Sequence, residues 1–431
     1  MQSAPWISNY LTEHFADDAY RTLAGYTARG GYEAARKVLR EMQPVDVVEL
    51  VKNAGLQGRG GAGFGTGLKW SFMPPEAGKP KYLVCNADES EPGSFKDRLL
   101  MERGPHQLLE GLLIGAFAIG AEKSFVYIRG EYSLAANVLQ QAIDEAYAAG
   151  HLGAGALGSG FRHDVVLQRG AGAYICGEET GLLESLEGKK GQPRKKPPFP
   201  AQYGAFGMPT TVNNVETFSH VPHIVRRGAE WFRGIGTEKS PGTTLFGVSG
   251  HVVRPGLYEL PLGTPLSEIV FEHARGVPGG KRVKGVIPGG MSMPILPADQ
   301  LDVRMANEFL RERKTMLGTG GIMVMDEDTC MVRAGCIITY FFRDESCGQC
   351  TQCREGTGWL HKIFQRIERG EGRDDDLAVL EDVAAKMEGQ TICAFSDAAA
   401  WPVQGLLRHF RSDFELHLRE RKCPFERSFE L

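Results

Sequence analysis

Three of the nine cysteines lie close together in the sequence, at a spacing suited to metal chemistry. Cys347, Cys350 and Cys353 form a C-x2-C-x2-C pattern, in which Gly348 permits a tight bend. Because disulfides are rare in a reducing compartment, clustered thiols indicate metal or redox chemistry. Three thiolates at this spacing, completed by a fourth cysteine, hold an iron–sulfur cubane. The pattern therefore predicts a 4Fe–4S cluster.

Two cysteines compete for the place of fourth ligand. Cys393 follows two helical stretches, so the chain could fold back to the triplet there. Cys423 is followed by Pro424, as the last cysteine of a ferredoxin motif often is, but it lies in a charged tail. The alternative for the triplet is a structural zinc site, which usually pairs two C-x2-C arms, and no second arm exists here. The remaining cysteines are expected to be small buried apolar residues: Cys85, Cys176, Cys330, Cys336 and Cys423.

A glycine-rich loop over residues 58–67 is the second candidate site. Six of its ten residues are glycine, and it contains a formal G-x-G-x-x-G. The preceding segment, 47–54, has apolar residues at helical spacing, so the loop lacks the strand that the dinucleotide fingerprint requires. Closely approaching backbone N–H groups can still receive a phosphate, and Lys69 would add a positive charge. A nucleotide cradle is favoured over a flexible surface loop.

The elements around this loop indicate an α/β layer. Short strands are predicted at 82–85, 124–128 and 164–167, separated by helices with apolar stripes after Pro105 and Leu134. Alternating strands and helices favour a parallel sheet, whose ligands bind beyond the carboxyl ends of the strands.

Polar residues follow these strands, at 86–93, 170–180 and 210–216. Each has a structural alternative: helix N-terminal charge for Glu178 and Glu179, and capping for Asn213 and Asn214. Three such loops beside a glycine cradle together favour a cofactor site. The basic run 189–196 is expected to be a solvated loop rather than a phosphate clamp.

Composition bounds these interpretations. The chain has 431 residues, 42% hydrophobic and 24% charged, with a net charge of −4. This length suggests two or three domains, and the balanced charge argues against a nucleic-acid binder. The longest apolar stretch, 108–121, is too short to cross a bilayer. No signal peptide is apparent, so a soluble intracellular protein is expected, with peripheral attachment to a membrane complex left open.

Taken together, the motifs closely resemble the NADH-oxidising, FMN-carrying subunit of respiratory complex I, the NADH:quinone oxidoreductase. The resemblance runs from about residue 25 to about residue 411, and it favours Cys393 over Cys423 as fourth ligand. One departure is Gly65, where many relatives have proline. The matching stretches are 58–70, 82–98, 170–180, 196–202, 210–217, 345–356 and 391–403.

The resemblance also implies which residues bind the cofactors. NADH would lie over the flavin, with its adenine stacked by Phe64, Phe72 and Phe199 and its polar parts near Lys69. Glu91 and Glu179 would be catalytic in the sense of positioning the nicotinamide. The implied 4Fe–4S ligands are Cys347, Cys350, Cys353 and Cys393. The implied FMN contacts are Gly58, Arg59, Gly60, Gly61, Gly63, Gly67, Asn86, Asp88, Glu89, Gly177, Glu178, Glu179, Asn213 and Asn214.

The resemblance implies three domains: a Rossmann-like FMN/NADH domain over 1–240, a ubiquitin-like β-grasp domain over 241–327, and a helical bundle holding the cluster over 328–431. Past residues 318–321 the chain is expected to become helical, with helices around 359–368, 377–387 and 403–418.

The implied partners are a small thioredoxin-like 2Fe–2S subunit and a large multi-cluster iron–sulfur subunit, without nucleic acid or membrane insertion. The implied location is the cytoplasmic peripheral arm of a complex on the inner membrane. One alternative is the diaphorase subunit of a soluble NAD-linked hydrogenase or formate dehydrogenase, disfavoured because their extra iron–sulfur domains are not seen. A zinc-binding interaction protein is the alternative from another class.

Overall fold

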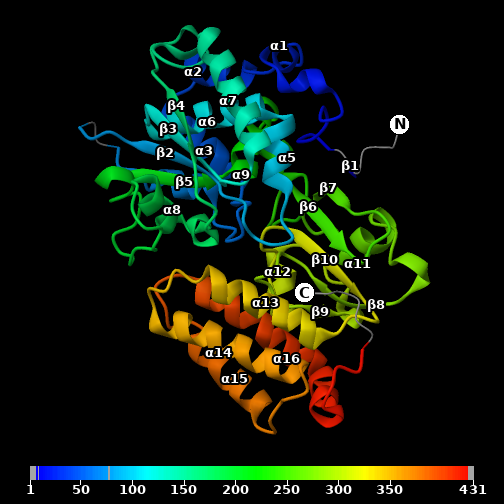
Figure 1. Ribbon diagram of the computed structural model, residues 1–431. Helices are drawn as coiled ribbons and strands as arrows, with labels where there is room; N and C mark the ends of the chain where they lie inside the picture. The colour runs from blue at the N-terminus through cyan, green and yellow to red at the C-terminus, as the bar shows by residue number, and fades with distance from the viewer. Residues whose placement is uncertain (1–5, 8, 76–77, 426–431) are drawn as a thin grey trace.

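A parallel four-stranded sheet forms the upper part of the molecule in Figure 1. The computed structural model describes residues 6–7, 9–75 and 78–425. The strand order is β4-β3-β2-β5, so the chain starts in the sheet interior and adds strands on both sides. This confirms the predicted α/β class and the three predicted strands. The strands are β2 (Tyr82–Ala87), β3 (Lys123–Ile128), β4 (Asp164–Arg169) and β5 (Thr210–Asn214).

Helices connect these strands and cover the sheet. The helix predicted after Pro105 is almost entirely buried, because it packs between the sheet and α9. Gly111 permits that approach: a Cβ there would lie 2.1 Å from the carbonyl oxygen of Phe218. The connecting helices are α5 (Lys96–Arg103), α6 (Pro105–Ile119), α7 (Ser133–Ala148), α8 (Glu179–Leu186) and α9 (Val215–Arg227). The others in this part are α1 (Leu23–Thr27), α2 (Glu33–Glu41), α3 (Pro44–Ala54), α4 (Thr66–Ser71) and α10 (Ala229–Arg233).

A second, mixed sheet of six strands lies between the first sheet and the helical bundle (Figure 1). Its order is β1-β7-β6-β10-β8-β9, and β1 near the N-terminus pairs in parallel with β7. Its strands are β1 (Trp6–Ile7), β6 (Thr243–Gly250), β7 (Gly256–Pro261), β8 (Val283–Ile287), β9 (Leu296–Pro297) and β10 (Gly321–Asp326), accompanied by the short helices α11 (Leu266–Glu268) and α12 (Asn307–Leu310).

The prediction that the chain becomes helical directly past residues 318–321 was wrong. Those residues lead into β10, which lies inside the sheet between β6 and β8. Ile322 and Val324 are buried in the sheet core, while Met323 and Met325 between them are less buried. A short apolar run fits a strand as well as a helix, and here the pairing partners decide.

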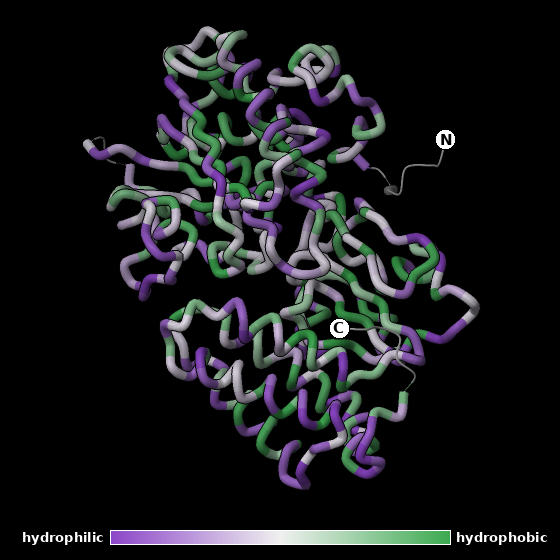
Figure 2. The backbone as a smooth tube through the Cα atoms, viewed as in Figure 1, coloured by the Kyte–Doolittle hydropathy of each residue, from purple (hydrophilic) through white to green (hydrophobic). Residues whose placement is uncertain are grey.

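Four long helices form the lower bundle, coloured yellow to red in Figure 1. The predicted helices at 359–368, 377–387 and 403–418 are found inside longer ones. Apolar residues concentrate on the inner faces of the bundle and along the strands, as Figure 2 shows. The bundle helices are α13 (Met331–Glu345), α14 (Thr351–Glu368), α15 (Asp376–Met387) and α16 (Phe395–Glu420).

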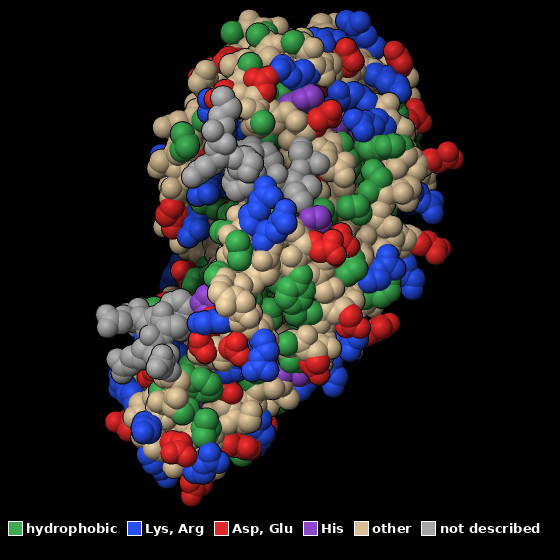
Figure 3. Space-filling view, turned by 90° about the vertical axis from the view of Figure 1, so that its right-hand side faces the viewer, with side chains coloured by type: hydrophobic (Ala, Val, Ile, Leu, Met, Phe, Trp, Pro, Cys, Tyr) green, Lys and Arg blue, Asp and Glu red, His purple; other side chains and the backbone are tan. Residues whose placement is uncertain are grey.

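The surface carries both signs of charge. Figure 3 shows acidic and basic side chains interspersed over one face, in keeping with the net charge of −4. In the described part of the chain, none of the helices combines the length and apolarity needed to span a bilayer.

Candidate functional site

The glycine-rich loop joins α3 to α4 and is held closed by its own backbone. Gly58 donates to the carbonyl of Phe64 at 2.8 Å, and Thr66 donates to the carbonyl of Leu56 at 2.8 Å. A Cβ on Gly60 would lie 3.2 Å from the Cβ of Asn214, so the loop packs on the end of β5. These contacts favour a shaped cradle over a flexible surface loop.

Arg59 anchors the same loop to the second sheet. Its guanidinium is buried and donates to the carbonyls of Pro241 and Thr243 at 2.9 and 3.0 Å. Its backbone N–H donates to the Thr217 hydroxyl at 2.9 Å. The side chain of Arg59 therefore fixes the position of the loop and points toward the protein.

The carboxyl end of β2 carries Asn86 and Asp88. The Asn86 amide donates to the carbonyl of Gly177 at 2.8 Å, which joins the loop after β2 to the segment that precedes α8. One Asp88 oxygen accepts from Ser90 at 3.1 Å, whereas Oδ2 is buried and has no hydrogen-bond partner. Burial raises the pKa of Asp88 to about 7. A buried carboxyl oxygen without a partner is expensive, so this atom is a candidate for contact with a ligand.

Glu89 behaves differently, because the chain itself saturates its carboxylate. The backbone N–H groups of Asp97 and Arg98 donate to it at 3.0 and 2.9 Å. The hydroxyls of Ser94 and Tyr132 donate at 2.9 and 3.1 Å. This carboxylate therefore binds the start of α5 and fixes the loop after β2.

Glu178 and Glu179 lie at the start of α8 and are held by lysines. Glu178 caps the helix by accepting from the backbone of Thr180 and Gly181, as the capping alternative required. Glu179 accepts from Lys69 at 2.8 Å and from Lys196 at 2.6 Å. Burial alone would raise the pKa of Glu179, but the two ammonium groups outweigh it and lower the pKa to about 2.

The basic run 189–196 is only partly the solvated loop that the sequence predicts. Lys189, Lys190 and Lys195 are exposed. Arg194 instead donates to the Gly204 carbonyl at 3.0 Å and to Glu187 at 2.7 Å. Lys196 reaches both glutamates at the start of α8. The prediction therefore missed Lys196, because the partners that bury it come from a distant helix.

Three aromatic side chains near this face are unusually exposed. Phe64, Phe72 and Phe199 have exposed fractions of 49%, 55% and 54%. The rings of Phe64 and Phe72 lie with centroids 6.1 Å apart. Apolar rings left open beside charged side chains are typical of a surface that stacks on a planar ligand.

Glu91 lies where the first sheet meets the second sheet and the bundle. Tyr174 donates its hydroxyl to Glu91 at 2.6 Å, and the backbone of Ser292 donates to it at 2.7 Å. Burial raises the pKa of Glu91 despite these donors. Tyr174 is also fixed by the bundle, since Glu345 accepts from its backbone N–H at 3.1 Å.

Asn213 and Asn214 at the end of β5 are tied into the protein. Asn213 accepts from the indole N–H of Trp70 at 2.9 Å. Asn214 caps α9 and also donates to Asp97 at 2.6 Å. Beneath them, the fully buried Lys96 pairs at 2.8 Å with both Asp97 and Glu216, a charge network that the sequence analysis missed.

The four predicted cysteine ligands lie at the end of the bundle that faces this sheet. Cys347, Cys350 and Cys353 lie between α13 and the first turn of α14, and Cys393 directly precedes α16. Burial raises the pKa of Cys393 to about 12, and the nearby Cys347 and Cys353 thiols add to the rise. The structure thus brings Cys393 to the triplet.

The cysteine site touches the nucleotide face. Gln192 donates to the carbonyl of Cys347 at 3.2 Å, and the charge of Glu178 is felt at Cys393. Cys423 lies instead beside Cys330, with 3.7 Å between the sulfur atoms. The two candidates for the fourth ligand therefore occupy different places.

Family models match the chain in three places. The Nuo51 FMN-binding domain matches residues 51–223, the SLBB domain residues 245–296, and the iron–sulfur binding region of NADH-ubiquinone oxidoreductase F residues 336–417. A relative from Rhizobium meliloti (strain 1021), the second NADH-quinone oxidoreductase F subunit of that organism, is 57% identical over 94% of this chain and 96% of its own length. The chain belongs to the family of NADH-quinone oxidoreductase F subunits.

Further comparisons agree with this assignment. The NADH-quinone oxidoreductase F subunit of Mycobacterium bovis (strain ATCC BAA-935 / AF2122/97) is 50% identical over 99% of this chain and 96% of its own length. Among solved structures, an NAD+-reducing NiFe-hydrogenase in the H2-reduced state matches with a TM-score of 0.83 and 38% identity, over 95% of this chain and 67% of that one. The resemblance inferred from the sequence motifs is confirmed.

Proposed function

We propose that this chain oxidises NADH with bound FMN and passes the electrons through a 4Fe–4S cluster to partner subunits of a quinone-reducing complex. The observation that carries this proposal is the direct contact between the two sites. The segment 174–178, which bears part of the nucleotide face, meets Glu345 and the cysteines of the bundle. A flavin accepts a hydride from NADH and returns electrons singly, which suits it to stand between a nicotinamide and an iron–sulfur cluster.

The residues at the sheet edge suit FMN. The glycine loop offers backbone close to the end of β5, and Asp88 keeps a buried oxygen without a protein partner. Asn86, Gly177, Glu178 and Asn214 surround the same edge. We assign the flavin to these groups, together with the other residues that the resemblance implies. For Arg59 and Glu89 the side chains serve to fix the two loops.

The open side of this face suits the nicotinamide dinucleotide. Phe64, Phe72 and Phe199 supply exposed rings for an adenine, and Lys69 is a cation for the phosphates. Glu179 is kept anionic by Lys69 and Lys196, so it can accept hydrogen bonds from a carboxamide or a ribose. Glu91, held by Tyr174 and Ser292, is the second positioning carboxyl.

We further propose Cys347, Cys350, Cys353 and Cys393 as the cluster ligands. Their sulfurs are not gathered as tightly as for a single ion: within the described residues, a group of three ligand atoms within 4.8 Å of one another forms elsewhere. A cubane places four irons and four sulfides between its thiolates, so it needs the wider arrangement. The division into domains at 1–240, 241–327 and 328–431 is part of the same proposal.

The partners and place of the chain follow as proposals from its family. The electrons would leave to a large multi-cluster iron–sulfur subunit, with a small thioredoxin-like 2Fe–2S subunit beside it. The assembly would be the peripheral arm of a complex on the cytoplasmic face of the inner membrane. The hydrogenase match supports one alternative, a diaphorase subunit of a soluble NAD-linked enzyme. Mass spectrometry of subunits that co-purify from the native host separates the two.

The central test is NADH-dependent ferricyanide reduction by the anaerobically purified chain. We expect activity that disappears when FMN is removed and returns when FMN is added. Iron and flavin should be present in the same preparation. A colourless protein that holds zinc but neither iron nor flavin would refute the redox function and favour a zinc-binding interaction protein.

A further inference from the structure

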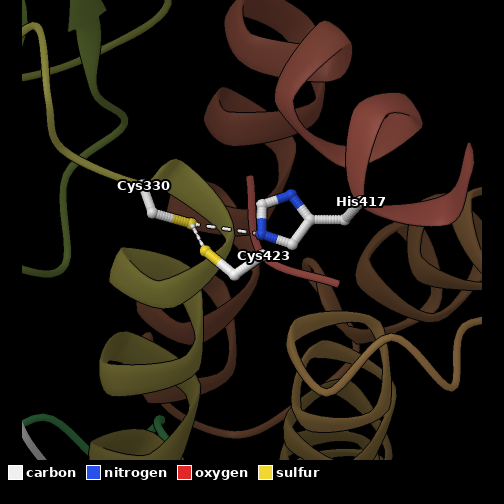
Figure 4. Close-up of side chains that lie close together, drawn as sticks. All are labelled: Cys330, His417 and Cys423. Atoms are coloured by element: carbon white, nitrogen blue, oxygen red, sulfur yellow. Dashed lines mark hydrogen bonds between the residues drawn. The ribbon is translucent and has the colours of Figure 1, made fainter. Parts of the chain in front are cut away.

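Three metal-binding side chains meet at the end of the bundle opposite the proposed cluster. Cys330 precedes α13, His417 lies in the last turn of α16, and Cys423 follows that helix (Figure 4). The sulfur of Cys330 lies 3.7 Å from that of Cys423 and 3.4 Å from Nε2 of His417. One ligand atom from each lies within 4.8 Å of the other two.

These separations match those of ligands on one tetrahedral zinc ion. Zinc bonds of about 2.3 Å to sulfur place two thiolates roughly 3.8 Å apart at a tetrahedral angle. Bonds of about 2.0–2.1 Å to histidine nitrogen place that nitrogen roughly 3.6 Å from each sulfur. The 3.7 Å and 3.4 Å separations therefore leave room for a zinc ion between the atoms.

The histidine is held in the tautomer that a metal requires. Its Nδ1–H donates to the carbonyl of Asp413, at 2.7 Å, one helical turn earlier. The lone pair of Nε2 is then directed at the sulfur of Cys330. A second hydrogen bond of this kind accompanies most metal-ligating histidines and fixes the ring orientation.

The surroundings of the three side chains are ordered and leave space for one more ligand. Asp413 accepts from Lys284 at 2.6 Å and from the backbone of Met331 at 3.3 Å, which joins α16 to β8 and to the start of α13. Beside Cys423 lies a cavity of about 360 Å³ whose lining includes Glu368. A water molecule or the Glu368 carboxylate could complete the four ligands there.

We propose that Cys330, His417 and Cys423 bind one zinc ion that clamps the C-terminal segment to the bundle. Two thiolates and a neutral imidazole are the mixed sulfur–nitrogen set that zinc accepts in tetrahedral sites. The set balances the charge of the dication. Because Cys423 lies beyond the last helix, the ion would tie residues 421–425 to the start of α13.

This zinc site is separate from the proposed cluster but lies on the same two helices. α13 starts beside Cys330 and ends just before Cys347, and α16 starts just after Cys393 and reaches His417. The fifteen residues of α13 span about 22 Å at a rise of 1.5 Å per residue. The two metals would therefore fix opposite ends of one helix pair.

The test measures zinc and iron together in the full-length protein. The chain is purified anaerobically from cells grown with both metals, and metal per chain is measured by mass spectrometry. We expect about one zinc in the unaltered chain and at least a tenfold loss in Cys423→Ala, with unchanged iron. Cys336→Ala, at another buried cysteine of α13, is the matched control and should keep its zinc. Cobalt(II) offered in place of zinc should give the thiolate charge-transfer bands of a tetrahedral site, absent in Cys423→Ala.

Two results would overturn the proposal. One is a zinc-replete preparation that holds neither zinc nor cobalt in the unaltered chain, including the case where Cys330 and Cys423 are found joined as a disulfide. The other is a zinc content equal in Cys423→Ala and the unaltered chain. Failure of the proposed redox function would look different, because iron and flavin would then be missing while zinc stayed bound.

Discussion

The sheet edge and the bundle end prepare their ligand groups in opposite ways. At the sheet edge, the carboxylates of Glu89 and Glu179 are held by donors from the chain itself. In the bundle, burial raises the pKa of Cys353 to about 11 and of Cys393 to about 12, so these thiols stay protonated without a metal. Thiolates are the form that binds metal, and metal binding releases their protons. The nucleotide face is therefore preorganised, whereas the cysteine site is completed by its ligand.

The largest effect should come from removing a cysteine ligand. We expect Cys393→Ala to lose at least nine-tenths of its iron, because three thiolates cannot hold a stable cubane. Electron transfer to a quinone should fail in the assembled complex. FMN content and NADH–ferricyanide activity should survive, because the nucleotide face does not depend on the metal. Iron and flavin assays on the purified variant measure both.

Cys423→Ala is the control for that experiment, since its sulfur lies beside Cys330. It should keep its iron. An unchanged iron content in Cys393→Ala would refute the ligand assignment. Loss of flavin together with iron would contradict the independence of the two regions.

The second prediction tests preorganisation at Glu89. Replacing this residue by alanine leaves two backbone N–H groups and two hydroxyls without their acceptor. Buried donors without partners cost free energy, so we expect Glu89→Ala to lower the free energy of unfolding by about 3 kcal/mol. Urea denaturation measures the difference, with the exposed Glu122→Ala as control. A change below about 0.5 kcal/mol would show that the loop after β2 does not depend on this carboxylate.

Local sequence patterns predicted most of the fold, because each strand and helix announces itself over a few residues. Apolar runs such as 82–85 and stripes such as that after Pro105 lie where expected. β10 was missed, since a four-residue apolar run after a glycine cluster fits either structure and only its neighbours β6 and β8 decide.

The site was predicted to the extent that its residues sit together in the sequence. The triplet from Cys347 to Cys353 is visible as a spacing, and so is the glycine loop. Lys196 was assigned to a solvated loop, because its partners Glu178 and Glu179 are brought near by folding. Cys330, His417 and Cys423 share no motif, since 87 residues separate the first two, and only the packing of α13 against α16 joins them.

The third prediction uses Asp88, where the sheet edge is not satisfied by the protein. Its pKa is raised to about 7 by burial, against about 3.9 in an unfolded chain. The folded state then binds more protons between these values, so the flavin-free protein should lose stability as pH rises from about 4 to about 7. We expect Asp88→Asn to remove about 2 kcal/mol of that loss.

Denaturation of flavin-free protein at pH 5 and pH 8 measures the Asp88 effect. The exposed Asp144→Asn serves as the matched control and should keep the pH dependence of the unaltered chain. If Asp88→Asn leaves the difference between the two pH values unchanged, the buried carboxyl is already neutralised by a partner, and the argument for a ligand at Oδ2 fails.

The smallest effect is expected at Glu179, whose pKa is lowered to about 2 in the folded protein. The sign is opposite to that of Asp88: this carboxylate stabilises the fold above its unfolded pKa of about 4.3, and the stabilisation is lost as pH falls toward 2. Lys196→Met removes one of its two cations, so at pH 7 we expect a loss of about 1 kcal/mol, reduced by solvent at this partly exposed pair. Urea denaturation at pH 7 and pH 4 measures it, and the exposed neighbour Lys195→Met should match the unaltered chain. Because Lys69 still holds Glu179, NADH should bind more weakly without the site collapsing. A loss in Lys196→Met as large as that in Glu89→Ala would mean that this lysine supports the fold of the face rather than the charge of one glutamate.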